Sequence, residues 1–128
     1  VTVAGGVTAT ATITNSYQPG DIMVTKVVDW GNVTPDANQA YEIIITGPTY
    51  PSGDSKAVGY SGGTVTWTDL EPGSYTVSEV DPGEAWAVIG SGVEVTVAGG
   101  VTATATITNS YHDTHRVYLP LAIRSIRP

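Results

Sequence analysis

The sequence contains no cysteine and no phenylalanine, and only 13% of its 128 residues are charged. Without cysteine there is no disulfide, so stability must come from the core or from another kind of cross-link. Neither a signal peptide nor an apolar run long enough to span a bilayer is present. We therefore expect no membrane span in this chain.

Basic residues are also scarce, since five lysines and arginines stand against twelve acidic residues, for a formal net charge of −7. Nucleic acids and anionic lipid surfaces are bound through clustered lysine and arginine, so we expect no nucleic-acid partner. The sequence shows no Ser-His-Asp arrangement, phosphate-binding glycine loop or paired carboxylates. His112 and His115 have no further histidine or cysteine near them, which argues against a metal site. We predict a protein that is not an enzyme and carries no cofactor.

Threonine, valine, glycine and alanine are abundant, as is typical of β-strands with hydroxyl-bearing solvent faces. Alternating residues between glycine and proline turn signals predict about seven short strands. These predicted strands are 22–30, 41–46, 64–68, 74–80, 85–89, 93–98 and 101–109. The number and spacing of the strands predict an all-β fold, an antiparallel β-sandwich.

An internal repeat sets the domain boundaries. The first seventeen residues, VTVAGGVTATATITNSY, recur without change at positions 95–111. We interpret residues 18–111 as one repeat unit of a tandem array and residues 112–128 as a separate C-terminal tail. Residues 1–17 are then either the closing hairpin of a preceding repeat or a donor strand for a neighbouring subunit, and the first interpretation is the simpler one.

Three polar residues share the parity of the apolar residues in their own strands, and parity decides which face of a strand a side chain takes. They are Lys26 in the first predicted strand, Glu79 in the fourth and Asn109 in the last. A lone charge inside a core costs several kcal/mol, so such groups normally pair or shift their pKa. The sequence therefore predicts that these groups meet in the interior.

A lysine, a carboxylic acid and an amide that meet in a dry interior can react. Desolvation favours the neutral amine of Lys26 and the protonated acid of Glu79, which can then polarise the side-chain carbonyl of Asn109. Attack by the amine would expel ammonia and leave an isopeptide bond. The structural alternative is that Lys26 extends to the sheet edge, Glu79 forms a salt bridge with it, and Asn109 caps a turn.

The segments that carry these residues, VTKVVDW, SYTVSEV and TITNSY, resemble the lysine, glutamate and asparagine motifs of collagen-adhesin B-type domains. The resemblance covers about residues 22–111 and implies an immunoglobulin- or transthyretin-like sandwich. It also implies a spontaneous bond between Lys26 and Asn109, with Glu79 as the catalyst. Asn15 stands at the position equivalent to Asn109, so it is a candidate for a cross-link in a preceding repeat or between chains.

Such domains are stalk modules of bacterial surface proteins. The resemblance implies a structural module of an extracellular filament, pilus-like fibre or cell-surface stalk, with copies of itself or neighbouring repeats as partners. The tail motif VYLPLAIR resembles a C-terminal ending of some secreted bacterial proteins.

The rival interpretation is a carbohydrate- or protein-binding module, either an adhesin or an accessory domain of a secreted enzyme. Its ligand would lie on a cell surface or in the extracellular matrix. Such a module would use exposed aromatic rings as a stacking platform, and the candidates are Trp67, Trp86, Tyr50 and Tyr60. Rings buried between the sheets would instead favour the stalk.

Overall fold

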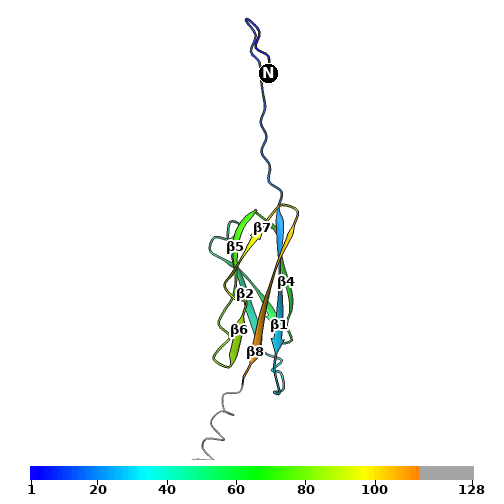
Figure 1. Ribbon diagram of the computed structural model, residues 1–128, viewed down its shortest axis with the longest axis vertical. Coiled ribbons are helices and arrows are strands. Elements are labelled where there is room, and N and C mark those ends of the chain that lie inside the picture. Colours follow the sequence, from blue (N-terminus) through cyan, green and yellow to red (C-terminus); the bar gives the residue numbers. More distant parts are fainter. Residues whose placement is uncertain (113–128) are drawn as a thin grey trace, which may run out of the picture.

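A computed structural model describes residues 1–112, so the tail motif lies outside the described residues. The described chain contains eight strands in two four-stranded sheets that face each other as a sandwich (Figure 1). One sheet has the order β4-β1-β8-β6, formed by β4 (Gly63–Leu70), β1 (Gly20–Asp29), β8 (Thr102–Tyr111) and β6 (Trp86–Ile89). The other has the order β3-β2-β5-β7, formed by β3 (Asp54–Gly59), β2 (Ala40–Thr46), β5 (Gly73–Glu79) and β7 (Val93–Val97).

The β-sandwich is confirmed, with one strand more than the seven predicted. The additional strand is β3, whose sequence DSKAVG buries only Val58 and so lacks an apolar alternation. Within residues 1–112 it is an edge strand that pairs only with β2, and this pairing rather than its own pattern defines it. The other seven strands begin and end within two residues of the predicted positions.

The first and last strands of the unit lie side by side and run parallel, whereas the other strand pairs of the two described sheets are antiparallel. The β1–β8 register runs from Asp21 opposite Thr102 to Asp29 opposite Ser110. β1 begins at one end of the elongated sandwich, and β8 leaves at the other (Figure 1). A pull on the two ends would therefore shear β1 along β8.

The core between the sheets is aliphatic and aromatic. Its buried members are Ile22, Val24, Ile43, Ile45, Val58, Trp67, Leu70, Tyr75, Val77, Val97 and Ile107. On β1 and β8 these residues alternate with outward-facing side chains, as the parity argument predicts. Lys26 and Asn109 continue the same inward rows and are buried with them.

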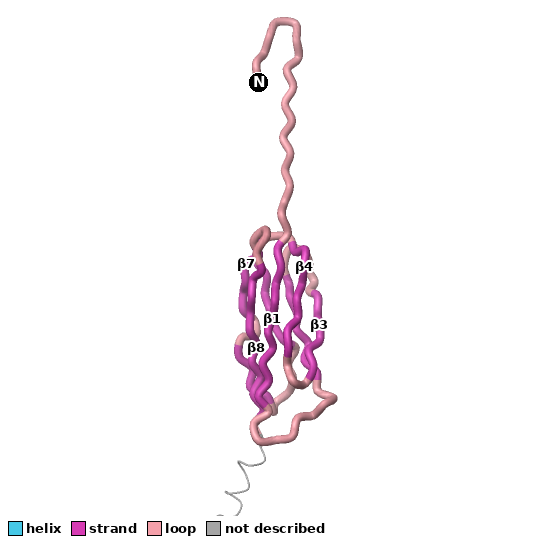
Figure 2. The backbone as a smooth tube through the Cα atoms, turned by 90° about the vertical axis from the view of Figure 1, so that its right-hand side faces the viewer, coloured by secondary structure: helices cyan, strands magenta, loops and turns pink. Residues whose placement is uncertain are grey.

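Residues 1–17, which we call the arm, form no strand and project away from one end of the sandwich (Figure 2). The arm nevertheless contains the same turn as the identical segment 95–111. The amide of Val7 donates to the carbonyl of Ala4 at 3.2 Å, just as the equivalent Val101 donates to Ala98 at 3.2 Å. Both turns need a glycine with positive φ, 74° at Gly6 and 73° at Gly100. Local sequence alone is therefore sufficient to form this turn.

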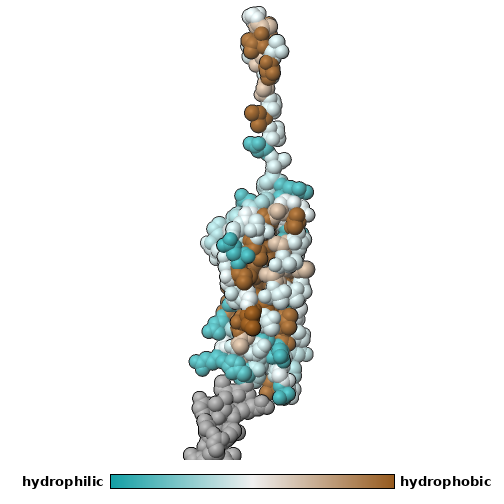
Figure 3. All heavy atoms as spheres, viewed as in Figure 1, coloured by the Kyte–Doolittle hydropathy of each residue, from teal (hydrophilic) through white to brown (hydrophobic). Residues whose placement is uncertain are grey.

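Apolar side chains of the arm are left in solvent. Val1, Val3, Val7 and Ile13 are 64–88% exposed. Figure 3 shows apolar groups distributed along the arm. In the described part of the chain, no helix is long and apolar enough to cross a membrane.

Candidate functional site

Lys26 lies inside the sandwich rather than at its edge. It follows Ile22 and Val24 on the inward row of β1, and only 2% of its surface is exposed. Its Nζ donates a hydrogen bond to Oε1 of Glu79, with which it forms an ion pair whose two side chains are fully buried. The same nitrogen lies 4.7 Å from the centroid of the Tyr41 ring.

Glu79 connects the two sheets. It is the last residue of β5 and lies opposite Ile43 of β2, so its side chain starts from the sheet that does not contain Lys26. While Oε1 accepts from Lys26, Oε2 accepts a 2.6 Å hydrogen bond from Nδ2 of Asn109. Each carboxylate oxygen thus holds one of the two proposed reaction partners.

Asn109 is fully buried on the inward row of β8, opposite Val28 of β1 and Val88 of β6. Lys26 lies opposite Ile107, so Lys26 and Asn109 are two positions apart along neighbouring parallel strands. The structure therefore brings Lys26, Glu79 and Asn109 together, and the cross-link itself stays a prediction. The carbonyl oxygen Oδ1 of Asn109 is buried without a hydrogen-bond partner among the described residues.

The electrostatics of the interior favour a reactive amine. Burial lowers the pKa of Lys26, and the hydrogen bond and negative charge of Glu79 oppose that shift. Burial, reinforced by the charge of Glu79, raises the pKa of Tyr41 to about 12. At neutral pH the phenol of Tyr41 therefore keeps its proton, while Lys26 deprotonates more readily than an exposed lysine.

Four aromatic side chains close the end of the sandwich next to these groups. The Trp86 ring packs edge-on against Trp30 at 4.9 Å, Tyr111 at 5.2 Å and Tyr41 at 5.5 Å between centroids. Trp30 also stacks on Tyr111 at 5.7 Å, and its indole nitrogen donates to the carbonyl of Tyr60 at 2.9 Å. The rings contact one another and separate the polar groups from solvent at this end.

Sequence reasoning missed this aromatic cluster, although a signal was present. Trp30 lies four residues after Lys26 and Tyr111 lies two after Asn109, so each has the parity of the buried polar residue in its strand. Beside the cluster is a cavity of about 440 Å³. It is lined by Trp30, Val33, Thr34, Asp36, Gln39, Trp86 and Tyr111.

The sequence matches no family model, and no curated protein matches it. Several solved structures match it. The major pilin T3.2 of Streptococcus pyogenes superposes with a TM-score of 0.56 at 12% identity, over 77% of this chain and 46% of the pilin. The pilus-presented adhesin Spy0125 gives 0.51 at 16% identity, over 74% and 28% of the two chains. The TIE protein of Bacillus anthracis gives 0.51 at 18% identity, over 73% and 17%.

The fold is that of pilin and pilus-adhesin domains. At sequence identities of 12–18% to these three proteins, the likeness establishes only the fold. The chain spans less than half of the length of each of them. This likeness agrees with the sandwich implied by the sequence motifs. The pilin-like sandwich thus holds a lysine, a glutamate and an asparagine in mutual contact in its interior.

Of the four rings considered for the rival interpretation, only Tyr60 is exposed, at 37%. Trp67 is only 2% exposed, and its indole nitrogen donates to Oδ2 of Asp54 at 2.8 Å. Tyr50 packs against the core, and Trp86 belongs to the aromatic cluster. Trp67 is buried because it occupies an inward position of β4, where its polar N–H finds a carboxylate partner.

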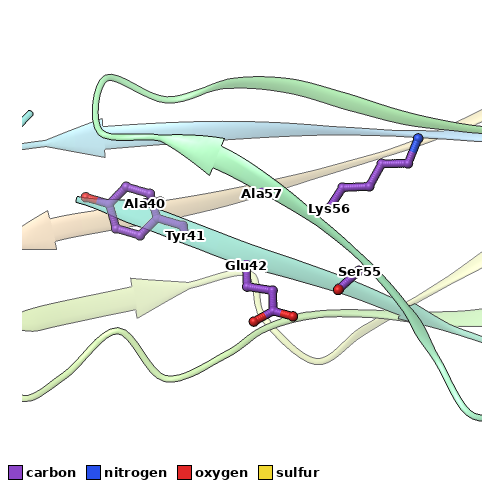
Figure 4. A pocket seen from close by; sticks show the side chains of 6 residues that line it. All are labelled: Ala40, Tyr41, Glu42, Ser55, Lys56 and Ala57. Atoms are coloured by element: carbon purple, nitrogen blue, oxygen red, sulfur yellow. The ribbon is translucent and has the colours of Figure 1, made fainter. Parts of the chain in front are cut away.

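A hollow over β2 and β3 offers no convergent polar groups. It is lined by Ala40, Tyr41, Glu42, Ser55, Lys56 and Ala57 (Figure 4). Figure 4 shows Glu42 and Lys56 extending away from each other, and Nζ of Lys56 donates to the carbonyl of Thr66 at 2.7 Å. We assign no binding role to this hollow.

The remaining predicted residues lie apart from the interior site. Asn15 is exposed on the arm, which projects away from the sandwich, so the structure does not bring it to Lys26 of the same chain (Figure 2). Among residues 1–112, no three histidine, cysteine or acidic side chains gather as a metal site would require. The amide of His112 donates to the carbonyl of Ala85 at 2.8 Å, whereas His115 lies outside the described residues.

Proposed function

We propose that this chain is a structural module of an extracellular filament or cell-surface stalk of a bacterium, stabilised by an isopeptide bond between Lys26 and Asn109. The observation that carries the proposal is that one buried carboxylate, Glu79, contacts both partners at once. A pilin and a pilus adhesin with the same fold support the filament role.

The contacts support a chemical role for each of the three residues. Glu79 accepts a proton from Lys26, which turns the ammonium into a nucleophile for the amide carbon of Asn109. The same carboxyl group can then protonate the departing amide nitrogen, because its second oxygen already contacts that nitrogen. A fixed pair of reactants in a closed interior has a high effective molarity, so one turnover needs no cofactor. Glu79 acts once per chain, and the module is not an enzyme that turns over a substrate.

The position of the bond suits a module under tension. The load enters through β1 and leaves through β8, which lie side by side and parallel. A covalent bond between Lys26 and Asn109 carries this load directly between the two strands. The hydrogen-bond ladders of the other strands are then spared, which is the mechanical advantage for a stalk or fibre.

The first test is the intact mass of the purified, denatured chain beside a Lys26→Met control. We expect the wild type to lack the mass of one ammonia and the control to keep its full mass. Digestion should yield a single fragment that contains both Lys26 and Asn109. A deficit that persists in the Lys26→Met chain would mean that ammonia is lost by another route, such as cyclisation of an asparagine onto its own backbone, and would overturn the assignment to Lys26. No deficit in the wild type would overturn the cross-link.

We also infer that the arm pairs as the closing hairpin of another unit, either a preceding repeat or a second copy. Its sequence is identical to that of residues 95–111, its turn already has the same geometry, and its apolar side chains lack cover. In such a unit Asn15 would lie where Asn109 lies here, next to the partner lysine.

A further inference from the structure

Two buried polar atoms have no hydrogen-bond partner within residues 1–112: the hydroxyl of Tyr41 and Oδ1 of Asn109. Buried polar groups in proteins are nearly always bonded, so each exception needs a cause. One of these atoms is a donor and the other is an acceptor. Both belong to residues of the interior site, because Tyr41 packs its ring against Nζ of Lys26, and Asn109 is bonded to Glu79.

The strand registers place both residues at the same level of the sandwich. In one sheet, Asn109 is two residues beyond Ile107, the residue opposite Lys26. In the other sheet, Tyr41 comes two residues before Ile43 in the sequence, and Ile43 is the residue opposite Glu79. Both displacements point toward the end of the sandwich that the aromatic cluster closes, and Tyr41 contacts Trp86 of that cluster. Tyr41 therefore faces the level of Asn109 from the opposite sheet.

Glu79 does not supply a donor to the carbonyl of Asn109. Its Oε1 is engaged by Lys26, and its Oε2 by the amide nitrogen of Asn109. This differs from the sequence-based prediction, in which the protonated acid polarises the carbonyl. Attack on an amide carbon moves negative charge onto the carbonyl oxygen, and a preorganised donor at that oxygen is a large contribution to catalysis.

We propose that the hydroxyl of Tyr41 donates the hydrogen bond that stabilises the negative charge on Oδ1 of Asn109 during isopeptide formation. This inference rests on the proposed cross-link and adds a fourth residue to its machinery. The side chain of Tyr41 packs against Nζ of Lys26 and the ring of Trp86. Its hydroxyl and Oδ1 of Asn109 are not hydrogen-bonded to each other before the reaction, so this hydrogen bond forms as charge develops on Oδ1. The raised pKa of Tyr41, about 12, keeps the phenol protonated and therefore a donor at neutral pH.

The reaction balances without any further reagent. The Lys26 ammonium gives one proton to Glu79, and its freed electron pair attacks the amide carbon of Asn109. The carbonyl π electrons move to Oδ1, where Tyr41 donates its hydrogen bond but keeps its proton. Glu79 passes its proton to the amide nitrogen and takes a second one from Nζ. The tetrahedral intermediate then collapses, the C–N bond of the former amide breaks, and ammonia leaves, with Glu79 neutral.

The test is the rate of ammonia loss in chains made by cell-free synthesis, quenched in acid at intervals and weighed intact. Tyr41→Phe removes only the hydroxyl, and we expect cross-linking to slow roughly a hundredfold, as for the loss of one oxyanion donor. The matched control is Tyr75→Phe. Tyr75 is also fully buried, but its hydroxyl is bonded to the Thr49 hydroxyl at 2.8 Å and to the carbonyl of Glu71. Its loss should leave the cross-linking rate within about threefold of the wild type.

Folding is checked separately from chemistry. In a Lys26→Met background, where no bond can form, adding Tyr41→Phe should leave the melting temperature unchanged within about 2 °C, because the hydroxyl has no hydrogen-bond partner to lose in the described part of the chain. If that pair of chains differs in folding, 3-fluorotyrosine at position 41 replaces the phenylalanine variant. It keeps the shape and strengthens the donor, and it should cross-link at least as fast as the wild type at pH 7.

A Tyr41→Phe chain that cross-links at the wild-type rate would overturn the role of Tyr41 and leave the isopeptide proposal standing. Equal slowing in Tyr41→Phe and Tyr75→Phe would also overturn it, since the effect would then come from general loosening of the core. A wild-type chain that never loses ammonia would overturn the proposed function and this inference together.

Discussion

At the scale of single residues, the interior depends on Glu79, because each of its oxygens holds a different partner from the facing sheet. Removing one member of a buried ion pair leaves the other charge uncompensated, which typically costs about 3–5 kcal/mol. Before any bond forms, Lys26 is such a charge. Its pKa is already lowered by burial and is held up only by Glu79.

We therefore predict that Glu79→Gln blocks cross-linking and makes stability depend on pH. Without the carboxylate the pKa of folded Lys26 falls further, whereas the unfolded lysine titrates near its ordinary value of 10.5. Between these two values the unfolded state binds more protons than the folded state, so stability rises with pH in this window. Urea denaturation from pH 6 to 10 should show the rise, and the double variant Lys26→Met, Glu79→Gln should lack it. A flat profile in Glu79→Gln would contradict a buried Lys26.

At the scale of elements, the central feature is that β8 has a second copy of its sequence in the arm. Both copies carry the inward row of β8, so either could in principle lie between β1 and β6. The hairpin in the same chain has the advantage of being intramolecular, and this disfavours exchange unless the local hairpin is weakened. The arm of one chain therefore competes poorly with the intact β8 of another.

This competition gives a test of strand donation. In Asn109→Ala, any covalent dimer that survives boiling in detergent must use Asn15 of one chain and Lys26 of another. We expect such dimers to appear with increasing protein concentration, and to vanish in the double variant Asn15→Ala, Asn109→Ala. Their absence from Asn109→Ala at millimolar concentration would restrict the arm to pairing within an array.

At the scale of the whole molecule, the chain enters the sandwich at one end through β1 and leaves it at the other end through β8, and these two strands are neighbours. The proposed bond would close a loop of about eighty residues, which by analogy with a disulfide stabilises the fold by roughly 4–5 kcal/mol. It would also remove residues 27–108 from the path of the force.

Pulling single molecules by their ends tests this directly. The Lys26→Met chain should release the segment between the two positions on unfolding, a gain in length on the order of 280 Å at about 3.4 Å per residue. The wild type should show no such step at forces below those that break covalent bonds. A wild-type trace with the full step would mean that the two strands are not linked.

Much of the site was predictable from sequence because strand parity is a local property. The alternation within β1 and β8 predicted that Lys26 and Asn109 point inward, and both are buried. The identical turns at Gly6 and Gly100 show the same local control, since glycine adopts the required positive φ with or without a partner strand. Where alternation was absent, as in β3, the prediction failed.

Only the tertiary structure decided which strands meet, because pairing joins residues far apart in sequence that no local pattern relates. It placed β8 parallel to β1, and it directed the two oxygens of Glu79 to different partners. Among the described residues it left Oδ1 of Asn109 without a donor, and it brought Tyr41 to the same level from the opposite sheet. The sequence by itself determined which polar groups enter the core, whereas the packing of the two sheets determined what each group can do there.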